Sequence, residues 1–145
     1  MLKLGSTYLK TKNMEKSIKF YSTLLNMKPS SQNYDRWAQF DFGGQCIALF
    51  NPDYDDRRIS SDENLEGVYS QNYIEYIRHE NIKYGNNMVL NFYIEDLKEE
   101  YERLQTLNIG EITQIMYMNI AMPYYSFVLI DPDGNEIEIA GEYKE

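Results

Sequence analysis

The chain has 145 residues, the length of one ordinary domain, and 43% of them are hydrophobic. No apolar run approaches the roughly 18 residues that a membrane span needs, and the first residues lack the apolar stretch and cleavage site of a secretory signal. We therefore expect a cytoplasmic protein without a membrane partner. A formal net charge of −9 argues against nucleic acid as a partner, because phosphate binding needs clustered Lys and Arg.

The first 50 residues predict one strand, one helix and three further strands. A strand-like run ends at Asn13, a residue suited to cap a helix, and apolar residues then recur at helical spacing at Met14, Ile18, Tyr21 and Leu24. A short strand fits over residues 28–34. Alternating residues over 37–42, a turn at Gly43–Gly44 and the apolar run 46–50 then predict a hairpin. Within that run the single cysteine, Cys46, is typical of a buried small hydrophobe.

Residues 51–87 predict an acidic connection between two halves. It contains four basic residues (Arg57, Arg58, Arg78 and Lys83) and eight acidic ones: Asp53, Asp55, Asp56, Asp62, Glu63, Glu66, Glu75 and Glu80. We expect at most a short helix, in the stretch "NYIEYIRHENI". Connections of this length tend to be lids, binding loops or partner contacts, and the alternative is a solvated link.

Residues 88–145 repeat the plan of the first half. Asp96 is suited to cap a helix whose apolar residues, Leu97, Tyr101, Leu104 and Leu107, lie 83 positions after those of the first helix. A strand fits over 112–119, and "DPDGN" at 131–135 is a good turn between two further strands. Gly134 follows Gly44 by 90 positions. The order β-α-β-β-β is therefore expected twice, in one α+β domain with first module 1–50, connection 51–87 and second module 88–145.

This duplicated module, with "NMEKSIKFYSTLLNM" after its first strand and "IDPDGNEIEI" near the end, resembles the glyoxalase/bleomycin-resistance/dioxygenase superfamily, also called vicinal oxygen chelate proteins. The resemblance covers residues 2–50 and 87–140. It implies two curved mixed sheets that form a shared cleft, and a homodimer. It does not specify an activity, because the superfamily contains metalloenzymes and metal-free binding proteins alike.

The resemblance also implies where a divalent metal would bind in the enzymes of the family. The four positions fall on Ser6, Ala48, Val89 and Glu138, and the offsets of 83 and 90 relate the first pair to the second. A metal needs three or four N, O or S donors, whereas Ala48 and Val89 have none and Ser6 is a poor ligand. The one histidine, His79, lies in the connection. We therefore expect neither a metal nor another cofactor.

Glu138 remains the distinctive residue of this set. A carboxylate between Ile137 and Ile139 needs a partner, so it either meets a polar or cationic ligand group or accepts a structural hydrogen bond from Ser6 or Tyr8. Alternation along the strands predicts the other cleft residues: Tyr8, Cys46, Phe50, Asn91 and Tyr93.

Three functions follow from these observations. The first is a metal-free small-molecule binding protein, similar to the bleomycin-resistance branch, that sequesters a cationic aromatic antibiotic or metabolite at Ser6, Tyr8, Ala48, Phe50, Val89, Asn91, Tyr93 and Glu138. The second is a glyoxalase-type lyase or dioxygenase, similar to lactoylglutathione lyase, with an atypical metal site. The third is a regulatory or interaction module whose acidic connection contacts a protein.

Overall fold

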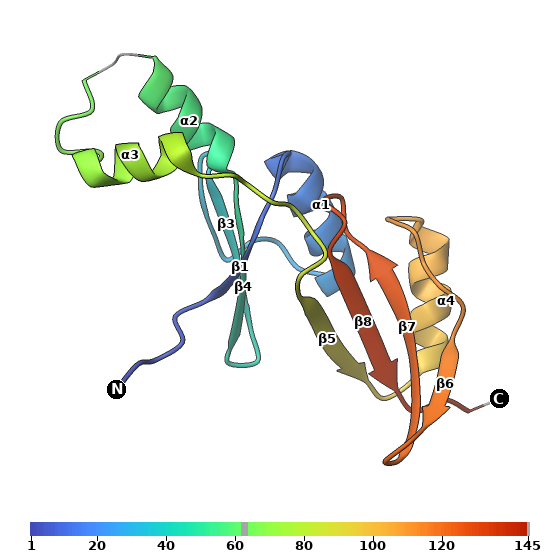
Figure 1. Cartoon of the computed structure of the whole chain (residues 1–145). Coiled ribbons are helices and arrows are strands. Elements are labelled where there is room, and N and C mark those ends of the chain that lie inside the picture. Colours follow the sequence, from blue (N-terminus) through green and yellow to red (C-terminus); the bar gives the residue numbers. More distant parts are fainter. Residues whose placement is uncertain (62–63, 145) are drawn as a thin grey trace. The chain divides into compact units, whose positions relative to one another are not determined.

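The computed structural model describes residues 1–61 and 64–144 and confirms an α+β fold with two tandem β-α-β-β-β modules (Figure 1). The first module consists of β1 (Thr7–Lys10), α1 (Met14–Leu25), β2 (Ser31–Asn33), β3 (Trp37–Phe42) and β4 (Gln45–Phe50). The second consists of β5 (Val89–Ile94), α4 (Leu97–Leu107), β6 (Met116–Asn119), β7 (Pro123–Ile130) and β8 (Glu136–Gly141).

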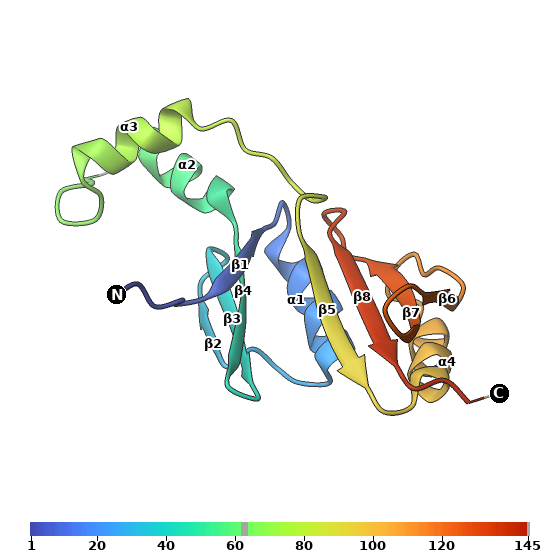
Figure 2. The same cartoon turned by 60° about the horizontal axis from the view of Figure 1, so that its bottom comes forward.

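Each module contains one mixed sheet with the same strand order. The order is β1-β4-β3-β2 in the first sheet and β5-β8-β7-β6 in the second, and Figure 2 shows the second sheet with α4 against one of its faces. The first strand of each module pairs in parallel with the last, and the other pairs are antiparallel. The predicted mixed sheets are therefore confirmed.

The strand register reproduces the spacing of the sequence repeat. Tyr8 lies opposite Ala48 in the first parallel pair, and Asn91 lies opposite Glu138 in the second. These partners differ by 83 positions (8 to 91) and by 90 positions (48 to 138), the two offsets of the sequence repeat. Ala48 and Glu138 thus occupy equivalent places in their own sheets.

The residues predicted to cap helices and to form a turn have these roles in the structure. The side chain of Asn13 accepts a hydrogen bond from the Lys16 amide at 3.0 Å, and Asp96 accepts one from the Glu99 amide at 2.9 Å, so both residues cap helices. Gly134 has a φ of +87°, which explains why the turn before β8 contains glycine.

The connection differs from the expected loop because two nine-residue helices form in it, α2 (Pro52–Ser60) and α3 (Gln71–His79). Asn51 and Ser70 cap their first turns, and Ile59, Ile74 and Ile77 form a small buried core between them. Helix α2 was not predicted because it contains few apolar residues. Two of the acidic residues counted there, Asp62 and Glu63, lie outside the described residues. We call α2 and α3 together the helical insert.

By its internal contacts the chain divides into two compact units. Unit 1 is Met1–Lys19 with Met27–Tyr84, and unit 2 is Phe20–Asn26 with Gly85–Glu145. Helix α1 therefore contributes to both units. In unit 2 the Tyr21 hydroxyl donates to Asp131 at 2.7 Å, and Arg103 donates to the Leu24 carbonyl at 3.0 Å.

Each sheet buries one apolar face. In unit 1 this face contains Leu9, Ala38, Phe40, Ile47 and Leu49. In unit 2, Phe127, Leu129, Ile137 and Ile139 are buried on the corresponding face, and Leu97 and Leu104 of α4 are buried too. Among the helices in residues 1–61 and 64–144, none has the length and apolar character needed to cross a membrane.

Candidate functional site

The opposite face of the first sheet is aromatic. Tyr8 contacts Trp37 edge to face, with ring centroids 5.2 Å apart, and Phe50, with centroids 6.1 Å apart. Cys46 and Ala48 alternate with Phe50 along β4, so they share this face. Cys46 is partly exposed, so the expectation that it is buried is wrong. The Arg36 guanidinium lies 4.9 Å from the centre of the Phe50 ring, a cation–π contact.

These rings line a pocket of about 240 Å³ within unit 1. Tyr8, Trp37 and Phe50 form one wall, and Tyr73, Tyr76 and Glu80 from α3 and its C-terminal end form the other. Lys10 also lines the pocket and pairs with Glu80. The hydrogen bond to Glu80 raises the pKa of Lys10 above its ordinary value, so the Lys10 ammonium stays charged at neutral pH.

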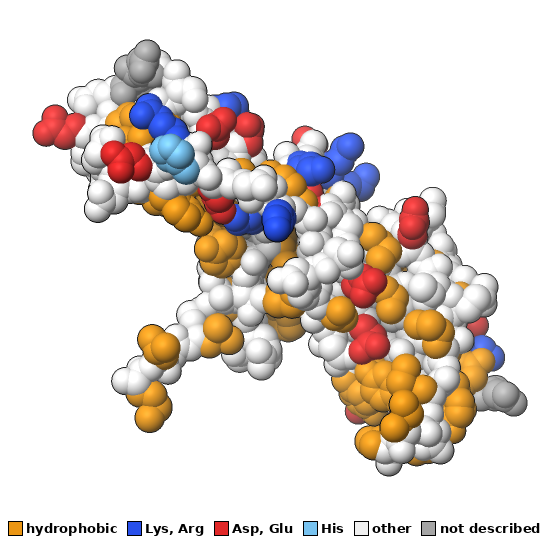
Figure 3. All heavy atoms as spheres, in the orientation of Figure 1, with side chains coloured by type: hydrophobic (Ala, Val, Ile, Leu, Met, Phe, Trp, Pro, Cys, Tyr) orange, Lys and Arg blue, Asp and Glu red, His pale blue; other side chains and the backbone are white. Residues whose placement is uncertain are grey.

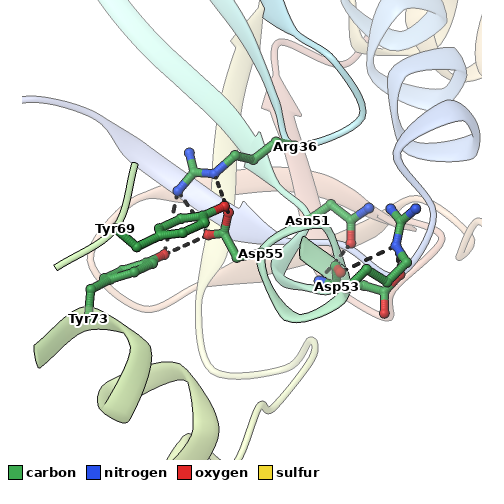
Figure 4. Close-up of polar contacts among 7 residues, drawn as sticks. Arg36, Asn51, Asp53, Asp55, Tyr69 and Tyr73 are labelled. Atoms are coloured by element: carbon green, nitrogen blue, oxygen red, sulfur yellow. Dashed lines mark hydrogen bonds and ion pairs between the residues drawn. The ribbon is translucent and has the colours of Figure 1, made fainter. Parts of the chain in front are cut away.

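A buried carboxylate holds α3 beside the sheet. Asp55 of α2 is fully buried and accepts two hydrogen bonds from Arg36, at 2.8 and 3.0 Å (Figure 4). It also accepts one from the Tyr69 hydroxyl at 2.7 Å and one from the Tyr73 hydroxyl at 2.6 Å. Burial acts to raise the pKa of Asp55, but the hydrogen bonds from Arg36, Tyr69 and Tyr73 together lower it below its ordinary value.

The predicted site residues of the first module differ in their surroundings. Tyr8 and Phe50 both line the aromatic pocket, whereas Ser6 precedes β1 and is partly exposed. Ala48 is 0% exposed and therefore presents no surface to a ligand in unit 1. Tyr73, Tyr76 and Glu80 were not predicted as site residues. The spacing of Tyr73, Tyr76 and Glu80, which repeats at the period of a helix, is the signal that could have indicated it.

In the second module Glu138 takes part in a triangle of hydrogen bonds. Its Oε1 accepts from the Asn91 amide at 2.6 Å and from the Tyr124 hydroxyl at 3.0 Å. The Asn91 amide also donates to the Tyr124 hydroxyl at 3.1 Å. Asn91 was predicted as a neighbour of Glu138, whereas Tyr124 was not assigned to the site.

Strand alternation explains why a carboxylate is tolerated in β8. Ile137 and Ile139 point to the buried face, at 0% and 3% exposure, and Glu138 points to the other face, where it is half-buried. Burial, and next the hydrogen bond to Glu138, raise the pKa of Tyr124. Its hydroxyl is therefore a donor to the carboxylate at neutral pH.

Exposed apolar side chains surround this triangle. Val89 and Tyr93, both predicted site residues, are 49% and 68% exposed, and Met118 of β6 is 48% exposed. Tyr93, Met122, Tyr124 and Tyr143 line a groove of about 520 Å³. Glu138 does not line this groove, but Tyr124, which donates to Glu138, does. Figure 3 shows hydrophobic side chains gathered over the strands of the second module.

The four positions that the family resemblance assigns to a metal do not fit one. Ala48 and Val89 supply no donor atom, and Glu138 Oε1 is already engaged by Asn91 and Tyr124. Over residues 1–61 and 64–144, no group of three or more His, Cys, Asp and Glu side chains could hold a metal ion.

Several solved structures resemble this chain. A lactoylglutathione lyase from Agrobacterium tumefaciens is 19% identical with a TM-score of 0.63, over 96% of this chain and 92% of that one. A protein from the mobile metagenome of V. Pseudocholerae is 23% identical with a TM-score of 0.63, over 99% and 97%. A glyoxalase-related enzyme from Fulvimarina pelagi is 18% identical with a TM-score of 0.62, over 98% and 89%. At these identities the likeness establishes the fold alone.

The family assignment rests on the match of the sequence to a family model. No curated protein matches the chain at a significant level. The sequence model of the Glyoxalase/Bleomycin resistance protein/Dioxygenase superfamily, however, matches residues 3–139, which include both modules and the connection. That match agrees with the repeated β-α-β-β-β order and with the register of the two parallel strand pairs. The chain therefore belongs to the glyoxalase/bleomycin resistance protein/dioxygenase superfamily.

Proposed function

We propose that this chain is a metal-free small-molecule binding protein whose second module takes a cationic ligand with an aromatic or conjugated part. The observation that carries the proposal is the triangle of Glu138, Asn91 and Tyr124 on a partly exposed, apolar sheet face. A polar group held in place among exposed rings is typical of small-molecule sites.

The hydrogen bonds leave one oxygen of Glu138 for a ligand. Both donors act on Oε1, and no other described residue of unit 2 donates to Oε2. A carboxylate oxygen is an acceptor only, so Oε2 suits a donor, and a charged donor gives the stronger bond. Asn91 and Tyr124 would keep the carboxylate oriented before the ligand arrives, which lowers the entropy lost on binding.

The rings beside Glu138 supply the apolar part of the site. Tyr93 and Tyr124 both line the groove of about 520 Å³, which lies within the range of roughly 300 to 1,000 Å³ common for small-molecule sites. Tyrosine combines apolar area with a polar tip and attracts cations to its ring face. A flat cationic molecule in the groove would contact these rings, and a donor group that extends past Tyr124 would reach the carboxylate.

The test compares two variants on the same sheet face. Glu138→Gln keeps the shape and removes the charge, so affinity for bleomycin and for 2-naphthylmethylammonium should fall about tenfold, because a hydrogen bond to a charged group contributes about 1.5 to 3 kcal/mol. Glu136→Gln removes an equal charge two residues away, outside the hydrogen-bond triangle, and should leave both affinities within about twofold. Isothermal titration calorimetry measures both.

Two outcomes would overturn this function. If Glu138→Gln lowers the melting temperature but leaves both affinities unchanged, Glu138 is a structural acceptor and no ligand contact. If protein purified without chelator contains stoichiometric zinc, nickel, manganese or iron that Glu138→Gln removes, the chain is a glyoxalase-type metalloenzyme with an atypical site. Elemental analysis of both proteins decides that question.

A further inference from the structure

A second cavity within unit 1 is lined by residues of the helical insert and of the turn before β3. Its volume is about 580 Å³. Volumes of roughly 300 to 1,000 Å³ are common for small-molecule sites. Arg36 and Tyr73 line both this cavity and the smaller aromatic pocket, so the two are neighbours. We call it the insert cavity. Because α2 and α3 lie outside both β-α-β-β-β modules, it is a feature that the insert adds to the duplicated sheets.

Two stacked pairs of tyrosines line the insert cavity. The ring centroids of Tyr34 and Tyr54 lie 6.0 Å apart, with planes 13° from parallel. Those of Tyr69 and Tyr73 lie 5.5 Å apart, with planes 10° from parallel. All four residues belong to the lining, so flat aromatic surface reaches the cavity from α2, from α3 and from the turn before β3. A planar aromatic ligand suits such a lining, because it can stack on the rings.

Asp55 holds the Tyr69–Tyr73 pair in place. Both hydroxyls donate to this buried carboxylate, at 2.7 and 2.6 Å, and Figure 4 shows the two rings side by side with their hydroxyls directed toward it. Burial, and next the hydrogen bonds to Asp55, raise the pKa of both tyrosines, that of Tyr73 to about 12, so both rings are uncharged at neutral pH. This wall is ordered without a ligand, and less entropy is therefore lost when one binds.

Tyr34 presents its ring from a backbone conformation that a bulky residue rarely adopts. Its φ is +50°, in the left-handed region, and the Gln32 side chain donates to its carbonyl at 3.0 Å. The side chain is 75% exposed, so burial offsets little of the conformational strain. Asparagine or glycine would adopt this turn more readily. A strained position that keeps an exposed ring points to a role for the ring itself, and stacking on a ligand is such a role.

The charges of the lining favour an uncharged ligand. Arg36 and Arg58 line the cavity, and none of the described lining residues is acidic, so a cation would meet two guanidinium groups. An anion would find both guanidinium groups engaged, because Arg36 is paired with Asp55 and Arg58 also interacts within the chain. The net charge of −9 opposes an anion further.

Asn33, the last residue of β2, adds a polar group to this lining. It is exposed, so its side-chain amide is accessible to a ligand. An amide contains both a donor and an acceptor. A ligand with a donor and an acceptor along one edge could therefore form two hydrogen bonds with it.

We propose that the insert cavity is a binding site for an uncharged planar aromatic molecule with an amide-like edge, such as an aromatic amide or an amide-containing heterocycle. The ring of the ligand stacks on the tyrosines, and its edge bonds to the Asn33 amide. This site differs in ligand charge from the one proposed for Glu138, and it does not rest on that function.

The experiment titrates the full chain with three probes that share one ring. They are 2-naphthamide, which is uncharged, 2-naphthoate, the anion, and 2-naphthylmethylammonium, the cation. Isothermal titration calorimetry should show that 2-naphthamide binds at least about tenfold more tightly than 2-naphthoate, because only the amide offers a donor and an acceptor without a charge.

Tyr34→Asn tests the stacking. It removes the ring and places at this φ a residue that tolerates the left-handed region, so the melting temperature should not fall. Affinity for 2-naphthamide should fall about fivefold through lost stacking. Tyr117→Asn is the control: Tyr117 is 55% exposed and also contacts another tyrosine, Tyr125, but belongs to unit 2, so the affinity should not change.

Asn33→Ala tests the polar edge. Affinity for 2-naphthamide should again fall about fivefold, because the hydrogen bonds to the side-chain amide are lost. Asn72→Ala removes an exposed asparagine of α3 that does not line the cavity, and it should leave the affinity unchanged. Circular dichroism shows whether each variant is folded.

Four results would overturn the proposal: no binding of 2-naphthamide to the unmodified protein, equal affinity for 2-naphthoate, an affinity that neither Tyr34→Asn nor Asn33→Ala lowers, or equal weakening by the two control variants. One further comparison separates the two sites. Glu138→Gln should leave 2-naphthamide binding unchanged, and Tyr34→Asn should leave 2-naphthylmethylammonium binding unchanged, so either site can fail while the other stands.

Discussion

Asp131, the first residue of the "DPDGN" turn, makes hydrogen bonds within the turn and also to Tyr21 of helix α1. Its Oδ1 accepts from the backbone amides of Asp133 at 2.9 Å and Asn135 at 2.8 Å, which closes the turn. Its Oδ2 accepts from the Asn135 side chain and from the Tyr21 hydroxyl, each at 2.7 Å. One buried carboxylate therefore links helix α1 to the hairpin that presents Glu138.

Tyr21→Phe should destabilise the protein by about 1.5 to 3 kcal/mol, because Tyr21 is fully buried and donates to a charged acceptor. Urea unfolding followed by circular dichroism measures the change. Tyr101→Phe is the control: Tyr101 packs its ring on Phe127 but makes no hydrogen bond through its hydroxyl to a described residue. Equal destabilisation by both variants would show that the Tyr21–Asp131 bond contributes nothing.

At the scale of elements, the helical insert has little apolar core of its own, so polar contacts hold it to the first sheet. Its buried apolar cluster contains three isoleucines, with Leu65, Tyr69 and Tyr73 packed against them. Short helices with so little burial are marginal alone. The two hydrogen bonds from Arg36, the residue before β3, to Asp55 connect α2 to the first sheet, and the Lys10–Glu80 ion pair connects the end of α3 to β1. The hydrogen bonds from Tyr69 and Tyr73 to Asp55 connect α2 to α3 and to the residues before it.

Asp55→Asn should therefore loosen α3 before it unfolds the rest of the chain. It removes the charge opposite Arg36, and we expect a loss of about 2 to 3 kcal/mol, near the lower limit for a broken buried pair because the Arg36 side chain is 31% exposed. Hydrogen exchange of the α3 amides should accelerate by about 30-fold or more. Asp56→Asn, an exposed neighbour on α2, should leave the exchange rates nearly unchanged.

The same carboxyl gives the insert a pH dependence of defined sign. The pKa of Asp55 is lower in the folded state than its ordinary value near 4, so its ionised form is favoured by folding. This stabilisation is fully present above about pH 4 and is lost as the pH falls through the lower, folded-state pKa. Exchange of the α3 amides, corrected for its intrinsic pH dependence, should rise in that acidic range, and Asp55→Asn should abolish the effect.

At the scale of the whole molecule, the features that can be predicted from the sequence are those that show as a regular period or a constant spacing of residues. Duplication and the equivalence of Ala48 and Glu138 follow from two offsets, and the strand register confirms them. The mixed sheets follow from the family resemblance. The helical insert could not be predicted in the same way, because its folding depends on the buried carboxylate of Asp55. In the sequence, Asp55 cannot be distinguished from an acidic residue on the surface. Tyr124 was not predicted as a partner of Glu138, because the contact depends on how the neighbouring strands β7 and β8 pair.

The resemblance also predicts a homodimer, and the second module offers apolar surface for it. Val89, Tyr93, Met116 and Met118 are between 40% and 68% exposed. Exposed apolar groups of this number favour burial against another surface. Sedimentation should show a dimer at micromolar concentration, and Met118→Lys should weaken it more than Leu107→Lys, which changes an apolar residue of similar exposure on α4. A monomer at that concentration would contradict the prediction.

Because helix α1 is divided between the two units, the choice of boundaries matters when the chain is cut into fragments. The chain passes from unit 1 to unit 2 at residue 20, returns at residue 27, and enters unit 2 again at residue 85. A fragment that begins at the second sequence repeat lacks the Tyr21 hydroxyl that donates to Asp131 and the Leu24 carbonyl that accepts from Arg103. A half-gene cut at the repeat boundary therefore encodes an incomplete fold, and truncation studies need the α1 peptide supplied in trans or fused to the fragment.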